Sequence, residues 1–398
     1  MKICANRLET VSSDIRGDNY QLSLQMERDG INILKLNTGN PAAFGFPMPE
    51  SVRNGVFRKI NMTVGYCDVR GMLPAREAIF NYHRSKSIKN FTIDDIFIGN
   101  GVSEIANMIS TALFESGDEI LLPMPCYSLW SNEVLLHSAT PVFYRCDEDN
   151  EWNPDIEHIK SLITPRTKAL LIINPNNPTG ALYSDEILHA IVDIARKHDL
   201  IILSDEIYDR VVFDDHKHTS IASFAEDLLV VTMNGLSKSH CLCGFRCGWM
   251  VISGPEKLRN ELNIALLKIA SVRLSANAIM ETIIPDALAD TEYTNQMIQP
   301  GSRLYEQRKA SFEALDQIEG LSYVKNKAGL YVFPKLKQVH FSNDKAFAKD
   351  LLLKKHILIV PGSGFSMDTP DHFRIVMLPE PDVLKNAIQE IGNYIQSL

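Results

Sequence analysis

Short, unbroken hydrophobic runs recur along the first two thirds of the chain, and segments with helical spacing separate them. Runs of this kind are typical of strands that are buried on both faces of a sheet. One intervening segment, residues 102–116, carries Ile105, Met108, Ile109 and Leu113 at helical spacing. The alternation predicts an α/β fold with a mostly parallel, doubly wound sheet. The runs are residues 95–101, 118–123, 141–144, 169–174, 200–206, 228–235 and 248–253.

The last third of the chain has a different pattern. Shorter hydrophobic runs at 329–335, 357–362 and 372–378 precede an amphipathic helix that we expect to begin near Asp382. This pattern predicts a smaller α+β domain. We expect an N-terminal arm that contributes to the small domain, then the large domain and the small domain, at residues 1–47, 48–288 and 289–398.

Composition narrows the class of protein without identifying it. Hydrophobic residues make up 45% and charged residues 22% of the 398 positions, as in ordinary globular proteins. The 40 basic and 49 acidic residues give a net charge of −9, which disfavours a nucleic-acid surface. We find neither a membrane-spanning run nor a secretory signal, and the seven cysteines are not spaced as a disulfide framework. We therefore expect a cytoplasmic protein.

Polar residues follow several of the predicted strands at the point where each strand ends. Alone, each has a simple explanation: Asp205 as a cap, residues 174–180 as a turn, and Lys238 as an exposed lysine. In open α/β sheets, however, the carboxyl ends of the strands meet where ligands bind. The positions are Asn100–Gly101, Tyr127, residues 174–180, Asp205 and Ser237–Lys238.

This set of side chains suits the chemistry of pyridoxal phosphate (PLP). Lys238 offers an amine that forms a Schiff base with the PLP aldehyde, and Asp205 offers a carboxylate that keeps the pyridine nitrogen protonated. Phosphate binding is predicted where a strand turns into a helix, and Arg246 in a glycine-rich loop also suits a phosphate. A dinucleotide-binding loop fits less well, because Glu104 stands where the third glycine belongs.

The spacing of Lys238 and Arg246 within residues 234–249 resembles the cofactor-lysine signature of fold-type I PLP-dependent aminotransferases of class I and II. The resemblance covers essentially the whole chain and is closest to bacterial alanine transaminases, the glutamate-pyruvate aminotransferases. It implies the PLP-transferase fold type I and a ping-pong amino transfer between an L-amino acid and a 2-oxo acid. The other segments that carry it are residues 35–46, 65–71, 98–104, 173–184, 204–209, 300–308 and 370–378.

The resemblance also implies a role for each matching residue. Lys238 is then the Schiff-base lysine, Asp205 the partner of the pyridine nitrogen, and Tyr127 the side chain that stacks on the ring. Asn177 and Tyr208 contact the cofactor's phenolic oxygen. The phosphate is held by Gly101, Val102, Ser103, Ser237, Arg246 and, from a second subunit of a homodimer with shared active sites, Tyr66.

The same resemblance gives the substrate contacts. Arg374 binds the α-carboxylate, with Asn177 and the backbone of Gly39 beside it. The local pattern points elsewhere, because an arginine between Phe373 and Ile375 is normally exposed on an edge strand. The family resemblance outweighs this local pattern, and we expect Arg374 to bind substrate.

Two positions depart from the alanine transaminase pattern. Ser13 replaces an aromatic residue before Asp-Ile-Arg, and Cys126 stands before Tyr127 where an aspartate is usual. Arg16 is either a ligand for a distal carboxylate such as that of glutamate or a plain surface arginine. The amino-acid specificity therefore stays open between alanine or glutamate and an aromatic, basic or specialised amino acid. A PLP-dependent lyase on the same fold is a further alternative.

The remaining cysteine and histidine clusters do not predict a metal site. The spacing of His240, Cys241 and Cys243 lacks the paired geometry of structural zinc. We expect His216 and His218, in an aspartate-rich loop, to be exposed to solvent.

Overall fold

The computed structural model describes residues 3–398, and within them eight strands form one sheet, in the order β2-β9-β8-β7-β6-β3-β4-β5. Neighbouring strands among β3, β4, β6, β7 and β8 pair in parallel. β9 runs antiparallel to both its neighbours, and β5 antiparallel to β4. The expected mostly parallel sheet is thus confirmed. The strands are β2 (Ile96–Asn100), β3 (Glu119–Met124), β4 (Thr140–Asp147), β5 (Asn153–Pro154), β6 (Thr167–Ile173), β7 (Ile201–Asp205), β8 (Val230–Gly235) and β9 (Cys247–Ser253).

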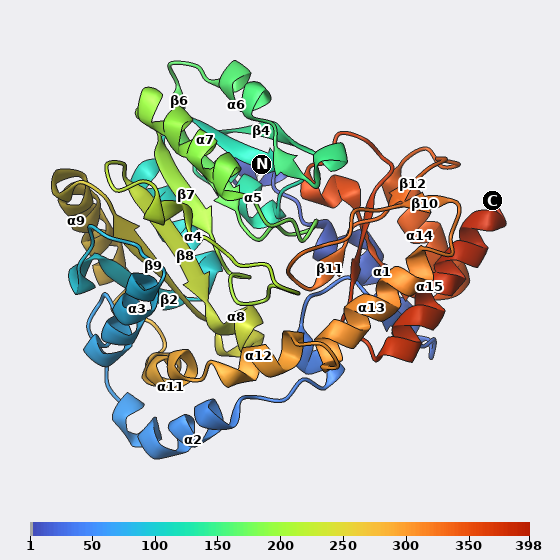
Figure 1. Cartoon of the computed structure of the whole chain (residues 1–398), viewed down its shortest axis with the longest axis horizontal. Helices are drawn as coiled ribbons and strands as arrows, with labels where there is room; N and C mark the ends of the chain where they lie inside the picture. The colour runs from blue at the N-terminus through green and yellow to red at the C-terminus, as the bar shows by residue number, and fades with distance from the viewer. Residues whose placement is uncertain (1–2) are drawn as a thin grey trace.

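Helices cover both faces of this sheet, as a doubly wound fold requires (Figure 1). Alternate strand residues point to opposite faces, so Leu121 packs in one core with α3 and α7, while Ile120 packs in the other with α4, α5 and α9. Both cores are built mainly from aliphatic and aromatic side chains with almost no exposed surface. These helices are α3 (Leu73–Ser85), α4 (Val102–Leu113), α5 (Ser128–Leu136), α7 (Asp185–Lys197) and α9 (Glu256–Arg273).

The C-terminal elements gather on the other side of the molecule, in orange and red in Figure 1. Three helices, α13 (Arg303–Leu315), α14 (Asp344–Lys355) and α15 (Pro381–Gln396), share a core with Leu36 from the N-terminal segment. The strand β1 (Leu34–Lys35) also pairs in parallel with β13 (Ile357–Leu358), so an N-terminal segment forms part of this C-terminal part of the molecule.

The hydrophobic runs of this region break into shorter strands than the sequence predicts. Residues 329–335 form β11 (Tyr331–Val332) and the first residue of β12 (Lys335–Leu336), with Pro334, which has no N–H to donate, between them. β11 and β14 (Val360–Pro361) flank β15 (Phe373–Val376), while β12 pairs with β10 (Leu321–Ser322). The remaining helices are α1 (Asp18–Arg28), α2 (Glu50–Lys59), α6 (Ile156–Leu162), α8 (Leu236–Ser239), α10 (Ala278–Thr282), α11 (Ile284–Ala289) and α12 (Glu292–Ile298).

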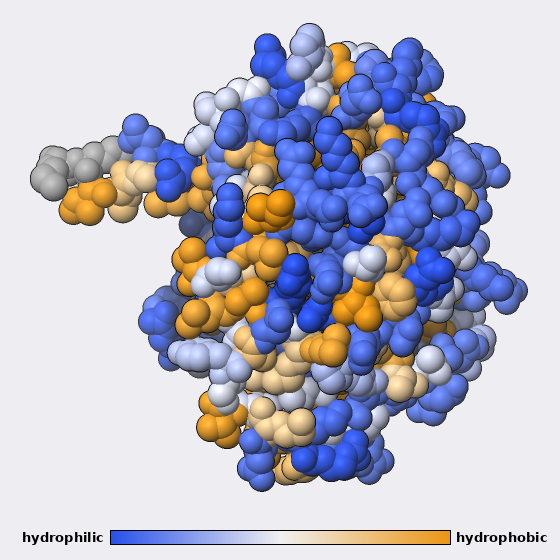
Figure 2. Space-filling model, turned by 90° about the vertical axis from the view of Figure 1, so that its left-hand side faces the viewer, coloured by the Kyte–Doolittle hydropathy of each residue, from blue (hydrophilic) through white to orange (hydrophobic). Residues whose placement is uncertain are grey.

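Large apolar side chains are exposed on the face that Figure 2 shows. Several of the exposed apolar residues of the described chain lie in α2 and the turn after it, or at the end of α9. They include Phe57, Ile60, Met62, Val64, Val272 and Leu274. In the part of the chain that the structure describes, no helix is long and apolar enough to cross a membrane.

Candidate active site

A cavity of about 780 Å³ opens at the carboxyl ends of the parallel strands. It collects nearly all of the predicted site residues, although they come from separate parts of the chain. Gly101 lies directly behind Arg246, whereas Tyr66 does not line this cavity. The predicted residues that line it are Ser13, Arg16, Gly39, Val102, Ser103, Tyr127, Asn177, Asp205, Tyr208, Ser237, Lys238, Arg246 and Arg374.

Lys238 lies on the short helix α8 that follows β8. Its Nζ donates to the carbonyl oxygen of Gly39 at 2.7 Å and lies 3.8 Å from Cys243 Sγ. Burial disfavours the charged amine, but the neighbouring Tyr331, Cys243 and Tyr127 outweigh burial and raise its pKa above the ordinary value. The lysine side chain therefore reaches the cavity as a protonated amine held in place.

Asp205 ends β7 and is buried. Its Oδ2 accepts a hydrogen bond from Trp130 Nε1 at 2.9 Å, and its Oδ1 accepts one from the backbone N–H of Ile207 at 3.2 Å. Burial raises the pKa of this carboxyl to about 6, even though both donors favour the ionised form. A cationic partner in the cavity would stabilise the carboxylate further.

Three tyrosines line the cavity, and one of them, Tyr331, was not among the predicted site residues. Tyr127 precedes α5 and Tyr208 follows β7, as predicted. Tyr331 in β11 comes from the C-terminal part, and its hydroxyl lies 2.8 Å from that of Tyr208. A Cβ at Gly39 would lie 2.2 Å from the Tyr331 oxygen, so a glycine is needed there. Tyr331 lies in a predicted strand. The hydroxyl group that it adds to this mostly hydrophobic run is the signal that could have identified it as a site residue.

The start of α4 provides a cradle for an anion. Gly101 precedes the helix at φ 83°, and the backbone N–H groups of Val102 and Ser103 are the first of the helix. Arg246 has φ 55°, and its guanidinium donates to the carbonyl oxygen of Cys243 at 3.0 Å. A Cβ at Gly101 would lie 2.3 Å from Arg246 Nη2, so the glycine makes room for the arginine. Free helical N–H groups next to a guanidinium fit a phosphate.

Arg374 is buried, with 1% of its surface exposed, because β15 is the central strand of its sheet. The edge-strand interpretation was therefore wrong. Its Nη1 donates to Asn177 Oδ1 at 2.9 Å and its Nη2 to the carbonyl oxygen of Asn37. Its guanidinium lies over the rings of Tyr331 and Phe365, at 4.2 and 4.7 Å. Among the described residues, its buried Nε has no hydrogen-bond partner, which leaves capacity for a ligand.

The three residues that we singled out for substrate specificity, Ser13, Arg16 and Cys126, have different surroundings. Ser13 and Arg16, at the 3₁₀ helix Asp14–Arg16, both line the cavity from its exposed side. Cys126 is fully buried, and burial raises its thiol pKa well above the ordinary value. Tyr66 is 84% exposed, outside this chain's own cavity.

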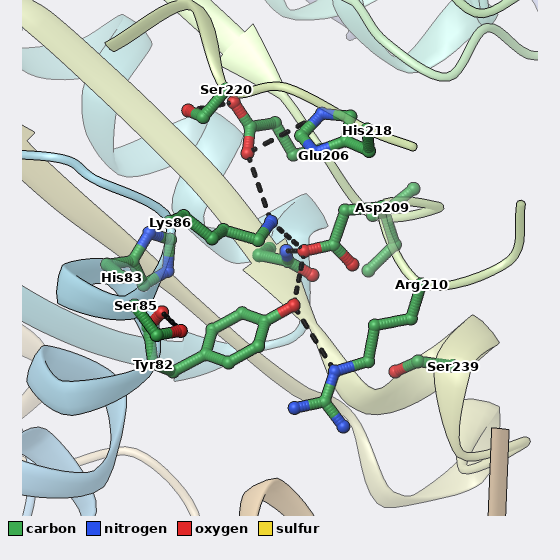
Figure 3. A network of polar contacts seen from close by, with 12 residues as sticks. Tyr82, His83, Ser85, Lys86, Glu206, Asp209, Arg210, His218, Ser220 and Ser239 are labelled. Atoms are coloured by element: carbon green, nitrogen blue, oxygen red, sulfur yellow. Dashed lines mark hydrogen bonds and ion pairs between the residues drawn. The ribbon is translucent and has the colours of Figure 1, made fainter. Parts of the chain in front are cut away.

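A buried network of charged groups includes Glu206, the residue directly after Asp205 at the end of β7 (Figure 3). Lys86 Nζ contacts Asp209 and lies 3.5 Å from Glu206 Oε2. Asp209 also accepts a hydrogen bond from Asn234 at 2.7 Å, in the strand that leads to Lys238. Burial disfavours the charged form of Lys86. The nearby Asp209, Tyr82 and Glu206 favour that charge more strongly, so the pKa of Lys86 is raised.

His218 belongs to this network, so our expectation of an exposed His218 was wrong. Its side chain is 2% exposed, its Nε2 lies 3.8 Å from Glu206 Oε2, and burial lowers its pKa. His216 is exposed, as expected. Glu206, Asp209 and His218 are close enough together to suggest a metal site. The Lys86 ammonium already supplies the positive charge between these carboxylates.

A lysine and an aspartate at the ends of adjacent strands, beside an anion cradle at a helix N-terminus, define a PLP-dependent enzyme with an open α/β sheet. The model of the aminotransferase class I and II family matches residues 31–391, and the chain belongs to this family. It is therefore an aminotransferase that uses PLP and acts on amino acids and 2-oxo acids.

Known proteins similar to this chain carry consistent names. Glutamate-pyruvate aminotransferase AlaA of Escherichia coli strain K12 is 44% identical over 393 residues, covering 98% of this chain and 97% of that protein. Alanine aminotransferase of Mycobacterium tuberculosis strain H37Rv is 43% identical over 394 residues, covering 98% and 92%.

Solved structures give the same result for the fold. The crystal structure of an aminotransferase from Escherichia coli has a TM-score of 0.97 at 44% identity, covering 100% of this chain and 98% of that one. An alanine aminotransferase from Pyrococcus furiosus has a TM-score of 0.95 at 34% identity, with both chains fully covered.

Proposed function

We propose that this aminotransferase exchanges amino groups between alanine and 2-oxoglutarate, and between glutamate and pyruvate, by a ping-pong mechanism. The arrangement that carries the proposal is Arg374, with its unused Nε, in the same cavity as Lys238. The names of the Escherichia coli and Mycobacterium tuberculosis relatives support these substrates.

Substrate binding follows from the groups that face the cavity. Arg374 binds the α-carboxylate, and its contacts with Asn177 and the Tyr331 ring fix the guanidinium plane. The carboxylate then remains on the substrate through the reaction. This favours cleavage of the Cα–H bond over decarboxylation, and therefore amino transfer over a decarboxylase reaction.

Lys238 and Asp205 divide the proton chemistry. PLP, when bound, accepts electrons from the bond that breaks at Cα. Lys238 would hold the cofactor covalently in the resting enzyme. Once the amino group of the substrate has displaced Lys238 from that bond, its freed Nζ would move the proton between Cα and the cofactor. Asp205 keeps a proton on the pyridine nitrogen.

The other cofactor contacts complete this assignment. Tyr127 stacks on the ring, while Asn177 and Tyr208 bind the phenolic oxygen. The phosphate is bound by Gly101, Val102, Ser103, Ser237 and Arg246, of which all but Gly101 line the cavity.

The side-chain pocket decides the amino acid. Arg16 at the cavity mouth pairs with the distal carboxylate of glutamate or 2-oxoglutarate. Ser13 leaves more room than an aromatic residue would. This is the observation that favours a second candidate, an aminotransferase that accepts a larger amino acid.

We further propose a cytoplasmic homodimer in which Tyr66 binds the phosphate in the partner's site. Tyr66 is 84% exposed and adjoins exposed apolar residues such as Met62 and Val64. Such a patch suits burial against a second copy. The seven cysteines are free thiols, which suits a reducing compartment. The domain division at residues 47/48 and 288/289 is part of the same proposal.

A half-reaction assay tests the substrate. The purified holoenzyme is mixed with each of the twenty amino acids in turn, and conversion of bound PLP to pyridoxamine phosphate is followed by absorbance. We expect alanine and glutamate to give the fastest conversion. Faster conversion with an aromatic or basic amino acid would support the second candidate, and no conversion with any amino acid would refute amino transfer.

A further inference from the structure

Trp130 forms the hydrogen bond to Asp205 from the helix next to the cavity. It lies in the first turn of α5, three residues after Tyr127, and is 1% exposed. Its Nε1–H donates to Asp205 Oδ2 at 2.9 Å. One helical turn therefore carries both the tyrosine at the cavity wall and the indole that touches the aspartate.

The chemistry of an indole suits this position. Its N–H only donates and does not titrate in the working pH range, so it stabilises the charged carboxylate more strongly than the neutral, protonated acid. A hydroxyl or an imidazole, in contrast, could also accept a hydrogen bond from the protonated carboxyl of Asp205 and so stabilise the neutral form. Trp130 therefore favours one protonation state of its partner.

Few other groups around Asp205 favour ionisation. Glu206, the next residue, opposes it, and burial opposes it most. Lys238 favours ionisation more weakly than the two hydrogen bonds do. Neighbouring Cys126 is buried and Tyr127 is half-buried, and both are neutral, with raised pKa values. The hydrogen bond from Trp130 is the strongest influence that lowers the pKa of this carboxyl.

We propose that Trp130 is a positioning residue that keeps Asp205 ionised and aimed at the pyridine nitrogen of PLP. The inference rests on the role of Asp205 in the proposed function. It predicts that loss of the indole N–H shifts the protonation of Asp205 toward higher pH. Catalysis and cofactor binding then weaken near neutral pH and recover in alkali.

The test compares Trp130→Phe with Trp249→Phe. Trp249 is also 1% exposed, and its Nε1 donates to His83 at 2.9 Å, away from the cofactor cavity. Both variants lose a buried indole and one hydrogen bond. Each is prepared as apoenzyme, and its Kd for PLP and the pH dependence of kcat are measured from pH 5.5 to 9.5.

We expect Trp130→Phe to raise the Kd for PLP about tenfold at pH 7 and to move the acid limb of kcat upward by about one pH unit. Both effects shrink toward pH 9, and KM changes little. Trp249→Phe keeps the wild-type Kd and pH profile. Equal effects of the two variants, or an unshifted acid limb in Trp130→Phe, would overturn the proposal.

Two further variants distinguish a failure of this inference from a failure of the proposed function. If Trp130→Phe does not fold, 3-benzothienyl-alanine at position 130 removes only the N–H, and the same shifts are expected. Asp205→Asn should abolish the acid limb and weaken PLP binding. If Asp205→Asn behaves as wild type, the role of Asp205 fails and the inference falls with it. If Asp205→Asn is impaired and Trp130→Phe is not, only the inference fails.

Discussion

The hydroxyl groups of Tyr208 and Tyr331 lie 2.8 Å apart and connect the strand ends of the large sheet with the C-terminal part of the molecule. The Tyr331 ring also lies 4.2 Å from the guanidinium carbon of Arg374. One side chain therefore contacts both the proposed ligand of the cofactor's phenolic oxygen and the proposed carboxylate ligand. This contact links cofactor binding to substrate binding.

Tyr331→Phe should lower kcat about tenfold or less with little change in KM, because it removes one neutral hydrogen bond and keeps the ring under Arg374. Tyr331→Leu should also raise KM for alanine, because the cation–π contact is lost. Steady-state kinetics of both variants check this. A raised KM in the Phe variant would contradict the division of roles.

Lys238→Ala should fold but retain no covalently bound cofactor, because the amine at position 238 is the one that reaches the cavity beside Gly39. Borohydride reduction followed by mass spectrometry of peptides measures the attachment. In the wild type we expect the label at Lys238, and Lys168, near the start of β6 and paired with Asp118, serves as the control position. Label at another lysine, or a labelled Ala variant, would refute the assignment.

Arg374→Lys should raise KM for every amino and 2-oxo acid by roughly 30-fold or more, because a lysine cannot replace the planar, bidentate guanidinium. The substitution also leaves Asn177 Oδ1 and the Asn37 carbonyl oxygen short of a donor. Arg16→Lys is the matched control, and it should affect only glutamate and 2-oxoglutarate. Equal losses for alanine in both variants would count against a separate α-carboxylate site.

The sequence predicted the strands of the large sheet well because unbroken aliphatic runs such as 169–174 have no other stable place in this chain. The polar site residues at the strand ends could be predicted because ligands bind at the carboxyl ends of the strands in open α/β sheets. Trp130, Tyr331 and His218 were not found. Each depends on a contact between elements distant in sequence, such as the 75 residues that separate Trp130 from Asp205. Local pattern also gave the wrong surroundings for Arg374, because strand order in the small sheets is not encoded locally.

Lys86→Met should destabilise the protein by about 3–5 kcal/mol, since it leaves Asp209 and Glu206 buried without their counter-charge. Lys89→Met is the matched control three residues away. Its ion pair with Glu226 is exposed and is worth at most about 1 kcal/mol. Denaturant unfolding of the two apoenzymes measures the difference. Similar losses in both would mean that the network in Figure 3 contributes little to stability.

Asp205→Asn should stabilise the apoenzyme at pH 8, the opposite of its effect on activity. Burial raises the pKa of Asp205 to about 6, above its ordinary value of 3.8, so the folded apoenzyme holds this proton more tightly than the unfolded chain does. The wild type therefore keeps this part of its stability below about pH 4 and loses it as pH rises through 6. The loss amounts to roughly 3 kcal/mol at pH 8, since one pH unit corresponds to about 1.4 kcal/mol.

The variant has no such proton to lose, so the stability difference should grow from pH 4 to pH 7 and then stay constant. Denaturant unfolding of both apoenzymes across this range measures it. Addition of PLP should reverse the order, because a cationic pyridinium stabilises the wild-type carboxylate and not the amide. If the stability difference between the two apoenzymes did not depend on pH, burial would not raise the pKa of Asp205 in the apoenzyme. The site would then gain its affinity for the cofactor elsewhere.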